Sequence, residues 1–216
     1  MMNEWDLQDV LTKQWAECGL HIDGQRHLLV AWEVMLPSWL INDAKKHWTE
    51  PSLDFLVADE QMRLTVIELK TRVPGIKPAW QALCQVTHRA VQLSKTFSVA
   101  NLNRAFSACW SGSHGRLPSC GIYHSFAQYH RRFFGVSGHF RDGPPTVGRC
   151  VAATEFGESW ADVLKEFNQL PGDRLEARAC EELSSKQAHR ELERFRGIYM
   201  DDFSRLTSPV ITLHIA

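Results

Sequence analysis

The segment from Ser52 to Thr71, SLDFLVADEQMRLTVIELKT, carries three charged residues within otherwise apolar stretches: Asp54, Glu68 and Lys70. A charge in an apolar stretch is costly unless it is paired or bound to a metal ion. Two carboxylates beside an ammonium group can bind a hard divalent cation and stabilise negative charge that develops during a reaction. These three side chains are therefore the first candidates for a chemical site.

The two apolar halves of this segment are predicted to be strands of a β-hairpin centred on Gln61. In that register Asp54 faces Glu68, and Lys70 projects from the same face of the sheet. Opposed Cβ atoms lie about 4.5–5.5 Å apart, where like charges repel each other. A cation is therefore expected between the two carboxylates, either Lys70 or Mg²⁺, and a register shift of one residue would separate the carboxylates.

A solvated strand end would also explain these charges, as a surface ion pair of little energy. The segment LTVIEL is apolar on both faces, however, since Leu64 and Val66 alternate with Ile67 and Leu69. A strand covered on both sides is typical of the centre of a sheet. Ionisable groups at such costly positions tend to be functional, which favours a functional carboxylate pair.

The elements expected around the hairpin indicate an α/β domain with a central mixed sheet flanked by helices. Apolar residues recur at helical spacing in 4–18, and a strand is expected at 27–36. Breaks at Pro74, Gly75 and Pro78 precede a helix at 79–95. Residues 95–110 fit either a strand and turn or a helix. Further along, helices are expected at 123–134, 158–170 and 173–200, and strands at 146–156 and 209–216.

The composition is that of an ordinary folded protein of 216 residues, with 44% hydrophobic and 23% charged residues. The formal net charge of −1 gives no overall basic field that would indicate a nucleic-acid partner, although a local patch could still provide one. The N-terminus lacks the order of a signal peptide, and no apolar run approaches the roughly 20 residues that span a bilayer. We therefore expect a cytoplasmic protein without a membrane partner.

The six cysteines are scattered without a C-x-x-C pair, so we expect free thiols. A zinc site can be drawn from four residues, although their spacing fits no standard zinc pattern. These residues are Cys109, His114, Cys120 and His124.

The segment DFLVADEQMRLTVIELK resembles the signature of the PD-(D/E)XK nuclease superfamily, the restriction-endonuclease-like fold. In that family an Asp opens one strand and an acidic-x-Lys triplet lies on the next, which corresponds here to Asp54 and Glu68-Leu69-Lys70. The resemblance covers about residues 4–95, and Leu53 stands where the family name has Pro. It implies one nuclease-like domain over 1–216, with an α-β-β-β-α-β core, extra C-terminal helices and the remaining sheet within 97–216.

The resemblance implies an Mg²⁺- or Mn²⁺-dependent endonuclease that hydrolyses phosphodiester bonds, of DNA in preference to RNA. Asp54, Glu68 and the backbone carbonyl of Leu69 would hold the metal ion, and Lys70 would orient or help deprotonate the attacking water. Such an enzyme would serve restriction, repair or mobile-element biology. Many relatives act as dimers, so a homodimer or larger assembly stays open.

Further residues are candidates by position in the same pattern. Glu4 or Glu33 would complete the metal shell, although Glu4 is also a favourable acid in the first turn of a helix. Gln85, ahead of Gln81, would reach the site from the following helix, whose glutamines could equally form a plain solvent face. Four basic residues are weaker candidates for nucleic-acid contacts: Lys77, Arg89, Arg131 and Arg132.

Three other interpretations stay open. The domain could bind nucleic acid or a protein partner without cutting, or it could cut only within a larger assembly. A structural α/β protein with a fortuitous match is the third, a risk attached to any short motif.

Overall fold

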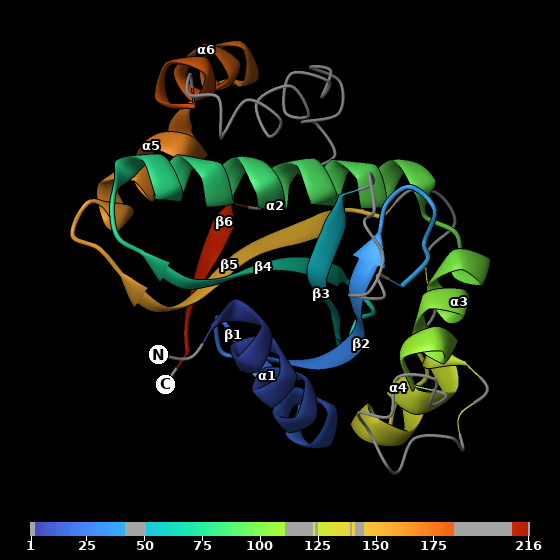
Figure 1. Ribbon diagram of the computed structural model, residues 1–216. Coiled ribbons are helices and arrows are strands. Elements are labelled where there is room, and N and C mark those ends of the chain that lie inside the picture. Colours follow the sequence, from blue (N-terminus) through green and yellow to red (C-terminus); the bar gives the residue numbers. More distant parts are fainter. Residues whose placement is uncertain are drawn as a thin grey trace.

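The computed structural model describes residues 3–41, 51–110, 123, 125–138, 140, 145–183 and 209–215. Within these ranges the chain forms a mixed sheet of six strands flanked by helices, as the sequence predicted (Figure 1). The helices are α1 (Glu4–Cys18), α2 (Ile76–Thr96), α3 (Val99–Trp110), α4 (Phe126–Phe134), α5 (Trp160–Gln169) and α6 (Gly172–Glu182). The strands are β1 (Leu20–Ile22), β2 (Gln25–Met35), β3 (Ser52–Asp59), β4 (Leu64–Val73), β5 (Val147–Phe156) and β6 (Val210–His214).

The strands lie in the sheet in the order in which they occur in the chain. The pairs from β1 to β4 are antiparallel, whereas β4, β5 and β6 run parallel to one another. A parallel neighbour requires a crossover connection. The chain between β4 and β5 contains α2, α3 and α4, and the chain between β5 and β6 contains α5 and α6.

Helices cover both faces of the sheet: α2 runs along one side and α1 lies on the other (Figure 1). On the α1 side, the ring of Trp15 packs against Phe55 of β3 with ring centroids 4.7 Å apart. On the α2 side, Arg149 of β5 donates a hydrogen bond to Thr87. This double cover explains why both faces of β4 are apolar and places β4 between two helical layers.

Helix α1 covers the range that its apolar spacing predicted, and its buried stripe includes Leu7, Leu11 and Trp15. Asn3 caps its first turn, where the Asn3 side chain and that of Asp6 each accept a hydrogen bond from the other residue's backbone N–H. This capping box fixes the end of the helix that faces the candidate site.

The sequence left one element open, missed a second, and predicted a third to be longer than the described residues show. The ambiguous segment 95–110 forms the end of α2 and then α3, because Leu102, Phe106 and Cys109 face the core at helical spacing. Strand β1 was not predicted, although Asp23 and Gly24, both with positive φ, form the Asp-Gly turn typical of a hairpin. The predicted long helix over 173–200 is described only as α6 to Glu182, and 184–208 lie outside the described residues.

Among the described residues, no helix combines the length and apolar character needed to cross a membrane.

Candidate active site

The hairpin of β3 and β4 has the register that the sequence predicted. Phe55 pairs with Ile67, and Ala58 pairs with Leu64. At the next position the ladder ends, and the carboxylate of Asp54 accepts a hydrogen bond of 2.7 Å from the backbone N–H of Leu69. Beyond this point β4 stays paired with β5 as far as Val73, and β3 stays paired with β2 as far as Ser52, so both strands remain fixed in the sheet. Asp54 is thereby held at the open end of the hairpin.

Lys70 provides the positive charge that this register requires. Its Nζ lies 2.8 Å from Oε1 of Glu68 and 3.8 Å from Oε1 of Glu4. The Glu68 side chain is 4% exposed and that of Lys70 is 22% exposed, so most of this contact is removed from water. The Glu68–Lys70 ion pair therefore belongs to the interior of the protein and differs from a solvated strand end.

The neighbouring strand β2 contributes a further carboxylate, that of Glu33, beside Asp54. The pairs of Trp32 with Phe55 and of Val34 with Leu53 place Glu33 opposite Asp54. Glu33 is buried, and its φ of 51° lies in the left-handed region that residues with a Cβ rarely adopt. Such strain costs about 1–3 kcal/mol and is concentrated at functional sites.

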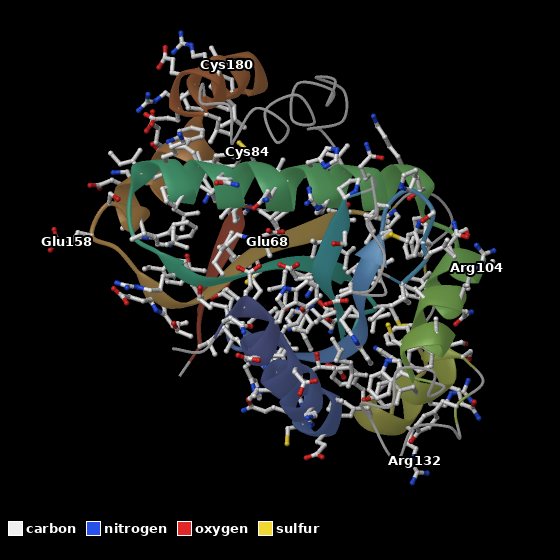
Figure 2. All side chains as sticks on the ribbon, viewed as in Figure 1. Glu68, Cys84, Arg104, Arg132, Glu158 and Cys180 are labelled. Atoms are coloured by element: carbon white, nitrogen blue, oxygen red, sulfur yellow. The ribbon has the colours of Figure 1, made fainter. Side chains whose placement is uncertain are left out.

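These side chains line one cleft with a volume of about 230 Å³. The cleft lies where the end of the hairpin meets α1 and α2, and Figure 2 shows Glu68 between these two helices. Four carboxylates and two basic side chains give it an excess of negative charge. Its lining residues are Glu4, Trp5, Gln8, Glu33, Ser52, Asp54, Glu68, Lys70, Gln85 and Arg89.

Crowded acids shift the protonation equilibria in the cleft. Burial, followed by repulsion from Glu68, raises the pKa of Asp54 well above its usual value, although Lys70 and the Leu69 N–H oppose the shift. Burial also raises the pKa of Glu4, against the attraction of Lys70. For Lys70, burial disfavours the charged form, yet Glu68, Asp54 and Glu4 together raise its pKa, so its ammonium group stays protonated.

The buried acceptor atoms that line the cleft include Oε2 of Glu68 and Oε1 of Gln85, which make no hydrogen bond among the described residues. A buried acceptor without a partner is costly, and a cation or a water would satisfy it. Oxygen donors from carboxylates and amides are the ligands that Mg²⁺ and Mn²⁺ prefer.

The cleft fits a hard divalent cation in donor type and in charge. Within the described ranges, however, no three His, Cys, Asp or Glu side chains are already grouped as ligands. Lys70 contacts one oxygen of Glu68, and the Leu69 N–H occupies one oxygen of Asp54. The carboxylates are thus engaged with partners from the protein, which a bound cation would have to displace or share.

The structure brings together most of the predicted site residues. Asp54, Glu68 and Lys70 meet as expected, and both glutamates that were alternatives for the metal shell, Glu4 and Glu33, line the cleft. Gln85 lines it too.

Gln81 lies one helical turn earlier on α2 and is not among the residues that line the cleft. Of the four basic candidates, only Arg89 reaches the cleft, where its Nε donates a hydrogen bond of 2.8 Å to the carbonyl of Ser52. Lys77 is exposed in the first turn of α2. Arg131 and Arg132 are exposed near the end of α4, and Figure 2 shows Arg132 far from Glu68.

Three further cleft residues were missed in the sequence, namely Trp5, Gln8 and Ser52. Gln8 is buried one turn after Glu4, and its amide donates a hydrogen bond of 3.4 Å to the carbonyl of Asp54. Trp5 stands next to Glu4 at the start of the helix. The spacing of Gln8 from Glu4 places both on one helix face, and this could have indicated Gln8.

The zinc alternative involves residues that mostly lie outside the described ranges, namely His114, Cys120 and His124. The fourth residue, Cys109, is buried in α3, where its sulfur contacts the backbone of Trp32 at 3.4 Å. None of the five described cysteines forms a disulfide.

Comparisons of the chain with protein-family models, with curated proteins and with solved structures found no match. The geometry of the cleft and the motif in the sequence are therefore the basis for any functional assignment.

Proposed function

We propose that this protein is an Mg²⁺- or Mn²⁺-dependent nuclease of the PD-(D/E)XK type, which hydrolyses phosphodiester bonds of DNA. The observation that carries the proposal is the meeting of Asp54, Glu68 and Lys70 at the open end of one buried hairpin. The acceptor oxygens of Glu68 and Gln85 that lack a hydrogen bond supply the second reason to expect a cation there.

In this proposal Asp54, Glu68 and the carbonyl of Leu69 hold the divalent cation. When bound, such an ion lowers the pKa of a water molecule and stabilises negative charge on the phosphate. The raised pKa of Asp54 means that cation binding must compete with a proton at this carboxylate. Glu33 and Glu4 add negative charge around the cation.

Lys70 acts as a cation in this scheme. Because its pKa is raised, its ammonium group stays protonated at neutral pH and can orient the attacking water or stabilise charge that develops on a phosphate oxygen. Arg89 is the second basic residue of the cleft, and its guanidinium is suited to a phosphate oxygen on the α2 side.

The proposal extends to the architecture, as one nuclease domain over residues 1–216 with a restriction-endonuclease-like core and helical additions. Its setting would be restriction, repair or mobile-element biology.

The test is cleavage of labelled single-stranded, double-stranded and branched DNA with Mg²⁺, with Mn²⁺ and with EDTA. Asp54→Asn and Lys70→Met should each lose at least 100-fold in rate, the scale on which one transition-state contact acts. Arg72 and Glu155 form an exposed ion pair on β4 and β5, so Arg72→Met and Glu155→Gln are matched controls that should retain activity.

Circular dichroism would confirm that each variant is folded. A wild-type protein that cuts no substrate, yet binds DNA or Mn²⁺ in a manner lost in Asp54→Asn, would favour a silent or partner-dependent module. A protein that neither cuts nor binds would refute the proposal.

A further inference from the structure

Trp5 differs from the other tryptophans that the structure describes. Its side chain is 52% exposed, whereas Trp15, Trp32, Trp39, Trp80, Trp110 and Trp160 are each at most 5% exposed. Trp5 makes no ring contact with any aromatic residue of the described ranges. An indole exposed in this way leaves about half of the residue's surface accessible to a ligand.

The position of Trp5 connects it with the candidate active site. It lines the cleft of Asp54, Glu68 and Lys70 and lies in the first turn of α1 beside Glu4. The capping box of this turn fixes the backbone that carries the indole. The ring is thus carried by a capped helix and lines the cleft.

Charge alone does not explain how this cleft would retain a polyanion. Four carboxylates face two basic side chains in the cleft, a bound divalent cation would bring the formal sum only to about zero, and the whole chain has a formal charge of −1. An aromatic ring offers contact energy that does not depend on charge, because every nucleobase has a π-face that can stack. Trp5 is the exposed aromatic residue in the cleft lining that could provide it.

The size of the cleft bears on the form of the substrate. The cleft has a volume of about 230 Å³, which is room for a phosphodiester group. A base in a duplex has both faces covered by its neighbours in the stack. A base must leave this stack before it can lie on Trp5, and that costs least in single strands, flaps and frayed ends.

We propose that Trp5 stacks on an unpaired nucleobase next to the scissile phosphate, so that single-stranded DNA or a single-stranded end is the preferred substrate class. This inference rests on the proposed nuclease function. Trp5 is a binding residue in it, and the cation and Lys70 act on the adjacent phosphate.

The test uses the full chain with a labelled single-stranded oligonucleotide and a set of copies that each lack one base. Trp5→Ala and Trp5→Leu should lower kcat/KM on the intact strand by about 5- to 150-fold, mainly through KM, whereas Trp5→Phe should retain most of it. Removal of the base that stacks on Trp5 should slow the wild type by a similar factor and leave Trp5→Ala unchanged. Blunt duplex should be cut more slowly than single strand by the wild type.

A binding measurement separates this inference from the nuclease proposal. Fluorescence anisotropy of the same oligonucleotide, with Ca²⁺ and with EDTA, should show weaker binding by Trp5→Ala and near wild-type binding by Trp5→Phe. This readout applies even if the wild type cuts nothing, in which case the nuclease proposal fails and Trp5 is judged by binding alone.

Three results would overturn the inference. The first is unchanged cleavage or binding by Trp5→Ala while Asp54→Asn abolishes cleavage, which leaves the nuclease proposal intact. The second is a cleavage rate of Trp5→Ala that is lower than that of the wild type by the same factor on every strand that lacks one base. Such a uniform loss would mean that Trp5 stacks on no particular base and has a structural role. The third is faster cutting of blunt duplex than of single strand. A wild type that neither cuts nor binds refutes both proposals.

Discussion

Replacement of Lys70 by methionine tests the electrostatic description of the cleft directly. The change removes the ammonium group 2.8 Å from Glu68 and keeps most of the aliphatic stem. Since Glu68 is almost fully buried, its carboxylate would lose its nearest cation without gaining water in exchange. We expect the folded state to be strongly destabilised at neutral pH.

The magnitude follows from the distance and the burial. Two unit charges 2.8 Å apart attract each other by about 6 kcal/mol at an effective dielectric constant of about 20. The cost of removing both ions from water offsets part of this attraction, and Lys70 keeps some contact with solvent. The free energy of unfolding should therefore fall by about 3–5 kcal/mol, the range for a buried pair that loses one partner.

The assay is urea unfolding at pH 7 in EDTA, with the slope against urea compared between variants. Glu68→Gln combined with Lys70→Met should be more stable than Lys70→Met alone, because the isolated buried charge has then been removed. Arg72→Met, which breaks an exposed ion pair on the same strand, should change the free energy by no more than about 1 kcal/mol.

Mg²⁺ provides a further arm of this experiment. A divalent cation in the cleft should stabilise Lys70→Met more than the wild type, because the variant lacks the competing ammonium group. A loss of less than about 1 kcal/mol in Lys70→Met would show that the contact with Glu68 behaves as a surface ion pair. A double variant no more stable than Lys70→Met would refute the reasoning from the buried charge.

Three other predictions concern single residues. Because burial and Glu68 raise the pKa of Asp54, the folded state holds a proton that the unfolded chain releases. The free energy of unfolding should therefore rise as the pH falls through that pKa and level off below the ordinary Asp pKa of about 3.9. Urea unfolding at a series of pH values would show this rise in the wild type and its absence in Asp54→Asn. Glu33→Gly should be about 1 kcal/mol more stable than Glu33→Ala in the same assay, because glycine accepts a φ of 51° without strain; equal stability would contradict this account. The thiol of Cys18 is exposed, whereas that of Cys150 is buried and burial raises its pKa, so Cys18 should react faster with an alkylating reagent. Mass spectrometry after brief alkylation should find Cys18 modified and Cys150 intact until the protein unfolds.

The hairpin shows how much local pattern can decide. Alternation of side chains with a period of two, together with a short turn, leaves few registers that keep the apolar residues inside. The sequence therefore predicted that Asp54 would face Glu68 with Lys70 on the same face, and the ladder from Phe55 to Ala58 has that register. Helix α1 was equally predictable, because its apolar stripe and its capping residues are local signals.

The neighbours of the hairpin were beyond such reasoning. Glu33 lies opposite Asp54 only because β2 shifts its register between Leu29 and Ala31 and then adopts a left-handed conformation at Glu33. Such a register shift is a β-bulge, which depends on packing between strands far apart in the chain. The apolar sequence around Glu33 does not indicate it. The sequence left Glu4 and Glu33 as alternatives, whereas the structure places both in the cleft.

The sequence by itself determined the class of fold, the hairpin register and the three charges at the open end of the hairpin, since these depend on periodicity within segments of about twenty residues. Only the tertiary structure decided which side chains from other elements complete the cleft. Gln85 and Arg89 reach it from α2, while Gln81 on the same helix does not. That selection depends on how α1 and α2 pack across the two faces of the sheet, and contacts between distant segments of the chain set this packing.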